Sequence, residues 1–246
     1  MIEVIHLSKS FSGQKVLDDI NLSIASGEFF VILGESGSGK SVLLRHLIGL
    51  LQPDQGSVVI GKNNISTMPE RELLNIRKDI GFLFQEGALY DFFTVHENVA
   101  FPLEEHTTLD QSTIEQKVKR MLEVVDLHDV NHKFPSELSG GMKKRVALAR
   151  AMILEPKVIF CDEPTSGLDP IRSKDISDLI RQISKKLQCT TIITSHDVQN
   201  SLRIADRLAL IRNGQIIKIG TKQELQFSED SYVREFISGA LTQTVA

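Results

Sequence analysis

The sequence predicts an α/β fold in which parallel strands alternate with helices. The apolar, β-branched runs at 157–161 and 190–195 do not alternate polar and apolar residues. Such runs are typical of strands that are buried on both faces of a parallel sheet. Segments with helical periodicity separate these runs along the chain. The 246 residues, 41% of them hydrophobic, are enough for one large domain or two small ones.

The first sixty residues indicate short strands joined by turns, and glycines lie at the turns between them. We expect this part of the chain to form an antiparallel N-terminal portion of the fold. The expected strands cover residues 2–9, 15–24, 28–34 and 56–61.

Helical signals dominate from the end of a strand at 80–85 to about residue 155. Thr94 and Glu97 have the spacing of a capping box that opens a helix. The pattern predicts a helical insertion at about 86–150 within the α/β core. The expected helices cover 95–105, 112–127 and 139–154, and they are followed by a strand at 157–163, a helix at 173–187, a strand at 189–197, a short helix and a hairpin at 207–220.

Composition excludes several classes of protein. The net charge of −4 gives no global electrostatic signature of nucleic-acid binding. Two cysteines, Cys161 and Cys189, cannot build a disulfide framework and favour a reducing compartment, and Cys161 within its apolar run is expected to be a core residue. The N-terminus lacks the features of a secretory signal, and no apolar run approaches the ~20 residues that span a bilayer. We expect a soluble intracellular protein or a soluble subunit that attaches to a partner.

The segment 34–51 begins with a glycine- and serine-rich loop directly after an apolar strand. Gly34, Gly39, Lys40 and Ser41 match the pattern G-x-x-x-x-G-K-[ST], in the strand–loop–helix context that a phosphate-binding loop requires. Glycines let the backbone approach phosphates closely, and the helix N-terminus favours an anion. Lys40 is expected to contact the β- and γ-phosphates and Ser41 to hold Mg²⁺. The alternative is a flexible turn.

An acidic pair ends the apolar strand at 157–163. We expect Asp162 to bind Mg²⁺ and Glu163 to orient or deprotonate an attacking water. The alternative is a solvated strand end.

A second candidate anion site lies at 139–145. Ser139 can cap a helix, and Gly140 and Gly141 leave its first amides accessible. Lys143, Lys144 and Arg145 crowd the first turns, where cations oppose the helix dipole, and a nearby phosphate would offset that conflict.

With these motifs in order, the chain resembles the ATPase subunits of ABC transporters over about residues 1–220. The segment "GESGSGKS" resembles their Walker A loop, "VIFCDE" their Walker B strand, "LSGGM" their signature and "SGLD" their D-loop. The resemblance implies a P-loop NTPase (RecA-like) core with an N-terminal antiparallel β subdomain and a helical signature subdomain. It implies that ATP and Mg²⁺ are bound, and that two copies hold two ATP molecules head to tail.

The resemblance also implies roles for individual residues. The implied catalytic residues are Glu163, His196, Gln85 and Lys40. The implied nucleotide-binding residues are Phe11, which stacks on adenine, Gly34, Glu35, Ser36, Gly37, Ser38, Gly39, Lys40, Ser41, Val42, Ser139, Gly140, Gly141 and Asp169. The implied Mg²⁺ ligands are Ser41, Gln85 and Asp162.

Four of these residues have plainer alternatives. In the plainer interpretation, Gln85 is a surface amide, His196 is a structural residue and Phe11 is a core residue. Asp169 is then simply the cap of a helix that starts at Pro170.

One substitution and one segment point to one branch of the family. Met142 replaces the usual Gln at the end of the signature, and it offers no polar side-chain contact there. Together with segment 84–107, it resembles the ATPases of MCE-type (Mla) phospholipid transporters. The aromatics Tyr90, Phe92 and Phe93 would suit a groove for a permease helix, or else pack internally.

That branch implies partners: two permease chains, an MCE-domain substrate-binding protein and, in some systems, a STAS-domain subunit. It implies a position on the cytoplasmic face of the inner membrane, reached only through those partners. Residues 221–246 are either a docking arm for a neighbour or a frayed terminus.

Rival functions remain within the wider family. An SMC-type DNA-repair ATPase would carry a long coiled coil between Walker A and signature, and 42–137 shows no sustained heptads. Translation-factor ABC proteins carry two cassettes, whereas this sequence has one. A signalling ATPase of the cell-division type, and a transporter of another substrate, both stay open.

Overall fold

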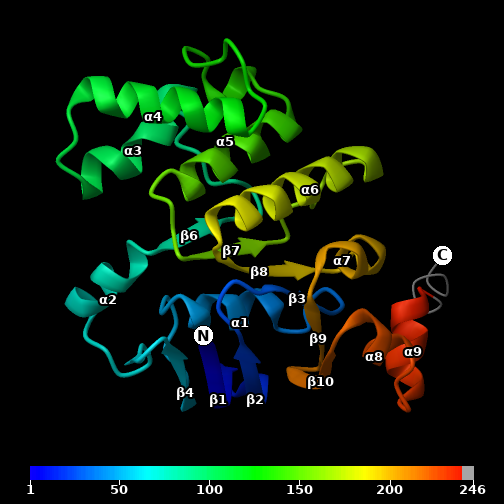
Figure 1. The fold of residues 1–246 in the computed structure, drawn as a ribbon. Coiled ribbons are helices and arrows are strands. Elements are labelled where there is room, and N and C mark those ends of the chain that lie inside the picture. Colours follow the sequence, from blue (N-terminus) through cyan, green and yellow to red (C-terminus); the bar gives the residue numbers. More distant parts are fainter. Residues whose placement is uncertain (240–246) are drawn as a thin grey trace. The chain divides into compact units, whose positions relative to one another are not determined.

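The computed structural model describes residues 1–239, which divide into two compact units (Figure 1). The first unit comprises Met1–Arg77 and the described residues from Thr190 onward, and the second comprises Lys78–Cys189. The fold is α/β, as the sequence predicts. Among the described helices, none combines the length and apolar character that a bilayer span requires.

An antiparallel sheet in the first unit confirms the expected N-terminal portion for the strands near residues 2–9, 15–24 and 56–61, whereas the expected strand at 28–34 pairs in parallel within the other sheet. Its strand order is β2-β1-β4-β5, and Ile2 at the start of β1 pairs with Ile24 on one side and Ile60 on the other. The strands are β1 (Ile2–Phe11), β2 (Gln14–Ile24), β4 (Gln55–Ile60) and β5 (Asn63–Asn64).

A second group of strands in the first unit has the order β10-β9-β3-β8. These are β3 (Phe29–Leu33), β8 (Thr190–Ser195), β9 (Arg207–Arg212) and β10 (Gln215–Gly220). Strand β3 runs parallel to β8 and β9, and β9 and β10 form the expected hairpin. Leu33 pairs with Ser195, so the residues that follow β3 and β8 leave the sheet at the same edge.

The second unit holds one parallel strand pair and the helical insertion. In the pair, β6 (Ile80–Leu83) and β7 (Val158–Asp162), Leu83 is opposite Cys161. The helices are α3 (Val95–His106), α4 (Gln111–Val124), α5 (Gly140–Met152) and α6 (Pro170–Leu187), with a short 3₁₀ turn at Pro135–Glu137. Cys161 is fully buried, as expected of a core residue, and burial raises the pKa of its thiol.

The helices of the first unit are α1 (Lys40–Leu47), α2 (Glu70–Arg77), α7 (Val198–Ile204), α8 (Lys222–Gln226) and α9 (Ser231–Ser238). The sequence did not predict α2, because Leu73 is its one buried residue and it offers no apolar stripe. Arg77 anchors it through hydrogen bonds to the Ile48 and Gly49 carbonyl oxygens. Of the expected tail at 221–246, residues 240–246 lie outside the described part of the chain.

A buried asparagine fixes the entry to α3. The Oδ1 atom of Asn98 accepts from the Tyr90 amide at 2.9 Å, and its Nδ2 donates to the Tyr90, Phe93 and Thr94 carbonyl oxygens at 3.0–3.1 Å. Asn98 is fully buried. The expected capping box of Thr94 and Glu97 is present beside it. Together these contacts hold the loop 90–94 in one conformation.

We therefore expect Asn98→Ala to lower the free energy of unfolding by about 3 kcal/mol, because several backbone groups lose a buried partner. Urea denaturation measures the change. The control is Glu105→Ala, an exposed position late in the same helix, with an expected effect below about 0.5 kcal/mol. Equal losses in both variants would contradict this account of the loop.

Candidate functional site

The loop between β3 and α1 has the backbone geometry that its glycines were expected to permit. Gly39 precedes α1 with φ 106°, a left-handed conformation that disfavours a side chain. At Gly34, a Cβ atom would lie 2.5 Å from the Ile211 carbonyl oxygen. The loop therefore packs against β9 more closely than any residue with a side chain allows.

Two polar side chains of this loop are buried with it. Lys40 is 6% exposed, and its Nζ atom donates to the Gly34 and Glu35 carbonyl oxygens at 2.9 and 3.0 Å. The Ser38 hydroxyl is buried and has no hydrogen-bond partner among the described residues. Buried polar atoms are normally satisfied, so an orphaned hydroxyl in the same loop as a buried ammonium group fits a loop that receives an anionic ligand. Ser41 follows Lys40 at the start of α1.

Two further predicted residues belong to the first unit. His196 is exposed and directly follows Ser195, so it leaves the sheet at the edge from which the loop 34–39 starts. Phe11 ends β1 and is 42% exposed, with the Lys9 ammonium 5.6 Å from its ring centroid. This exposure excludes the alternative that Phe11 is a core residue, and it leaves the ring available for stacking.

The acidic pair of the second unit is held at the end of β7. Asp162 is the last residue of the strand, and both Asp162 and Glu163 are 8% exposed. Glu163 has φ 46°, an uncommon conformation for a non-glycine residue. Its carbonyl oxygen accepts from the Ser166 amide at 3.1 Å, and the Ser166 hydroxyl accepts from Gln85 Nε2 at 3.4 Å. The structure thus brings Gln85 to the segment that follows the acidic pair.

The signature turn opens α5 as predicted. Ser139 is the N-cap, and its Oγ atom accepts from the Met142 amide at 3.3 Å. A Cβ atom at Gly140 would meet nothing within 4 Å, so the helix N-terminus is open to a ligand. A cavity of about 230 Å³ lies beside it, lined by Ser139, Gly141, Arg145, Arg172, Asp175 and Ile176.

The cations of this helix are arranged differently from the expectation. The Lys144 ammonium donates to the Gln85 carbonyl oxygen, and burial lowers the pKa of Lys144 against the opposing effects of Glu86 and Glu163. Arg145 donates to the Val125 carbonyl oxygen at 2.7 Å. These two cations are therefore satisfied within the second unit. The sequence could not reveal this, because their partners are distant along the chain.

Asp169 caps α6, which confirms the plainer alternative for that residue. Its Oδ1 atom accepts from the Ile171 and Arg172 amides, both at 3.1 Å. A role across a dimer remains a prediction. Ser166 belongs to the segment "SGLD", but its contact with Gln85 could not be predicted, because the two residues are 81 positions apart in the sequence.

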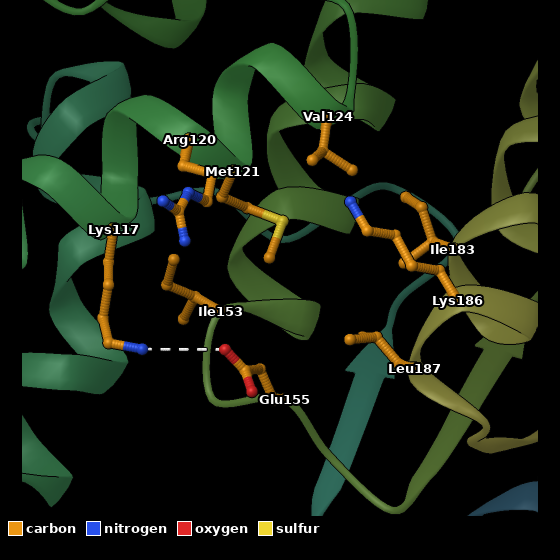
Figure 2. Close-up of a pocket in the computed structure, with 9 residues that line it drawn as sticks. All are labelled: Lys117, Arg120, Met121, Val124, Ile153, Glu155, Ile183, Lys186 and Leu187. Carbon is orange, nitrogen blue, oxygen red and sulfur yellow. Dashed lines mark ion pairs between the residues drawn. The ribbon is translucent and has the colours of Figure 1, made fainter.

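A separate pocket of the second unit contains none of the predicted nucleotide residues. Its volume is about 220 Å³, and it lies between α4, the turn after α5 and the end of α6 (Figure 2). The Lys117 ammonium lies 3.6 Å from Glu155 Oε1 at its rim. The lining residues are Lys117, Arg120, Met121, Val124, Ile153, Glu155, Ile183, Lys186 and Leu187.

Comparison with known proteins places these motifs in a family. The ABC transporter family model matches residues 17–166. The probable ribonucleotide transport ATP-binding protein mkl of Mycobacterium leprae is 42% identical over 97% of this chain and 69% of its own length. The intermembrane phospholipid transport system ATP-binding protein MlaF of Haemophilus influenzae is 41% identical over 97% and 90%, and the methionine import ATP-binding protein MetN of Clostridium acetobutylicum is 42% identical over 96% and 74%.

Solved structures give the same result. The ATP-binding cassette MJ0796, in a dimeric post-hydrolysis state with ADP and Pi, is 30% identical with a TM-score of 0.82, over 90% of this chain and 98% of that one. The cassette cbiO1 of Clostridium perfringens, part of the transporter complex cbiONQ, is 30% identical with a TM-score of 0.84, over 98% of both chains.

The geometry at α5 predicts that two neighbouring lysines, Lys143 and Lys144, contribute differently to stability. We expect Lys144→Gln to lower the free energy of unfolding by roughly 1–2 kcal/mol without nucleotide, because the Gln85 carbonyl oxygen loses a charged donor. Lys143→Gln, on the preceding residue, should change it by less than about 0.5 kcal/mol. Urea denaturation of the two variants tests this. A larger loss of stability in Lys143→Gln than in Lys144→Gln would show that the contact between Lys144 and the Gln85 carbonyl oxygen does not stabilise the fold.

Proposed function

The chain belongs to the ABC transporter family and is an ATPase of that family, and from this premise we propose that it powers a membrane permease that moves phospholipid or another hydrophobic molecule. The observation that carries the choice of substrate is Met142 at the end of the signature, where the family usually has Gln, together with the segment 84–107. The similarity to MlaF, named for intermembrane phospholipid transport, supports it.

The loop 34–41 is proposed to bind the phosphates of ATP. Lys40 supplies a buried positive charge next to the loop carbonyls, and Ser38 supplies a hydroxyl that has no other partner in the described chain. Phe11 stacks on the adenine, and base–aromatic stacking contributes about 1–3 kcal/mol. His196, at the same sheet edge as the loop, contacts the γ-phosphate.

Glu163 is proposed to hold and deprotonate the attacking water through its carboxylate. The residues proposed to hold Mg²⁺ are Ser41, Gln85 and Asp162, whose hydroxyl, amide and carboxylate oxygens are the hard donors that this ion prefers. When bound, the ion neutralises charge on the phosphate oxygens. The contact between Gln85 and Ser166 fits this assignment, because it holds the amide next to the acidic strand end.

The signature is proposed to complete the site of a second copy. Ser139 and Gly141 line an open cavity at the N-terminus of α5, where backbone amides and the helix dipole favour an anion. The dimeric state of MJ0796 with ADP and Pi supports the pairing of two copies, which are proposed to lie head to tail. ATP binding then closes the dimer, and hydrolysis and product release reopen it.

An aromatic cluster is proposed as the contact with the permease. Tyr90 packs against Phe92, Phe93 and Phe101 with ring centroids 5.2–5.8 Å apart. Phe92 nevertheless remains 74% exposed. The cluster thus packs internally and also presents a large apolar ring on a loop that Asn98 holds rigid, which suits a helix of a partner.

The rest of the proposed assembly follows the lipid-transport branch. It comprises two permease chains, an MCE-domain substrate-binding protein and, in some systems, a STAS-domain subunit, with this chain on the cytoplasmic face of the membrane. The similarity to MetN favours methionine import as a second candidate, and mkl is named for ribonucleotides. A force-transmitting signalling complex is a further candidate.

We expect Glu163→Gln to bind ATP with nearly unchanged affinity and to lose turnover by roughly 10²–10⁴-fold, because the water loses its base while the phosphate loop is intact. Lys40→Ala should instead weaken ATP binding itself. Calorimetry and phosphate release separate the two variants. Turnover of Glu163→Gln near the level of the unmodified chain would reject the role of Glu163.

The transport proposal predicts ATP-dependent movement of labelled phospholipid between vesicles by this chain in complex with its copurified membrane partner. The same complex with Glu163→Gln is the control. Movement of labelled methionine or a ribonucleotide, with no lipid movement, would assign one of the other substrates. An active ATPase in the complex that moves none of the three would favour signalling.

A further inference from the structure

A tyrosine near the C-terminus contacts the phosphate loop. The Tyr232 hydroxyl on α9 donates to Glu35 Oε1 at 3.1 Å, although the two residues are 197 positions apart. Glu35 is the second residue of the loop, directly after Gly34. The contact lies wholly within the first unit and links the last described helix to the nucleotide motif.

The tyrosine is held in place from several sides. The Arg212 guanidinium lies 3.8 Å from the centroid of its ring, a cation–π contact. The Asp230 side chain caps α9 and accepts from the Tyr232 amide at 2.8 Å. The apolar face of the helix is buried through Val233, Phe236 and Ile237. Burial, and then the contact with Glu35, raise the pKa of Tyr232, so its hydroxyl stays protonated as a donor.

The contact borders the place where phosphate is proposed to bind. A cavity of about 80 Å³ separates the loop from the turn between β9 and β10. The residues that line it are Glu35, Ser36, Gly37, Ser38, Ile211, Arg212, Asn213 and Tyr232. Tyr232 therefore sits beside the loop itself.

The charge of Glu35 is the reason that this contact matters. A carboxylate within a loop that receives an anion repels that anion, and it is also an acceptor for the same backbone amides. A hydrogen bond from Tyr232 holds the carboxylate to one side and disperses part of its charge. Without that bond, the side chain is free to turn over the loop.

We propose that Tyr232 is a positioning residue for ATP binding, which keeps the Glu35 carboxylate away from the phosphates and so makes the affinity for ATP depend on the seating of α9. The proposal uses the ATPase activity of the chain and does not depend on which molecule is transported. A partner or chain segment that displaces α9 would lower the affinity for ATP in the same way as loss of the hydroxyl.

The test is Tyr232→Phe, which keeps the ring over Arg212 and removes only the hydroxyl. We expect KM for ATP to rise roughly three- to fivefold while kcat stays within about twofold, since one hydrogen bond to a charged acceptor is lost and the water-activating groups are untouched. The control is Ser238→Ala, which removes a hydroxyl from the same helix that donates to the Glu235 carbonyl oxygen and, among the described residues, makes no hydrogen-bond contact with the loop 34–41. An unchanged KM in Tyr232→Phe overturns the proposal.

A second pair of variants, made in a chain that carries Glu35→Gln, distinguishes a positioning role of Tyr232 from a packing role. In Glu35→Gln, which has no charge to hold aside, adding Tyr232→Phe should change KM by less than about 1.5-fold, as a double-mutant cycle requires of coupled residues. If the full effect of Tyr232→Phe persists in that background, the tyrosine acts through the packing of α9 and the proposal is wrong. Thermal unfolding of all variants confirms that each is folded.

Discussion

The close approach of the loop at Gly34 to strand β9 is the constraint on which the first unit depends. A single added carbon at Gly34 would lie 2.5 Å from the Ile211 carbonyl oxygen, so the backbone there has no room to relax. This contact, with the left-handed Gly39, lets the chain turn from a buried strand into a helix within six residues of the sheet edge. Lys40 opens the helix with its ammonium group bonded back to the loop carbonyl oxygens of Gly34 and Glu35.

The proposed chemistry is divided between the two units. The first carries the groups proposed to bind phosphate, chiefly Lys40 and Ser38 of the loop, and the second carries Glu163, which is proposed to act on water. In both units the groups follow the carboxyl ends of parallel strands, where side chains leave a buried sheet and become available to a ligand. Loss of a phosphate contact and loss of the base are therefore separable failures, one of affinity and one of turnover.

Local patterns predicted most of the fold and the proposed phosphate contacts. The unbroken apolar run at 190–195 forms the parallel strand β8, and Thr94 and Ser139 cap helices, as predicted. These features could be predicted because each is determined by residues close by in the sequence. The sequence did not reveal that Lys144 is buried against the Gln85 carbonyl oxygen, or that Tyr232 reaches the loop. Those contacts join segments far apart in the sequence, and no periodicity or spacing encodes them.

The backbone at Glu163 supports its proposed role without reference to any relative. Ten non-glycine residues of the described chain have positive φ, and nine of them are exposed; most lie in turns and loops, and His6 and Asp19 lie at irregularities in the pairing of β1 with β2. Glu163 is buried, at 8% exposed, and its φ is 46°. Such a conformation costs of order 1–3 kcal/mol and persists only where the surroundings enforce it. Here the Ser166 amide donates to the main-chain carbonyl oxygen of Glu163 and holds the backbone in this conformation directly after Asp162, so the strain is stored where the position of one side chain is proposed to matter for chemistry.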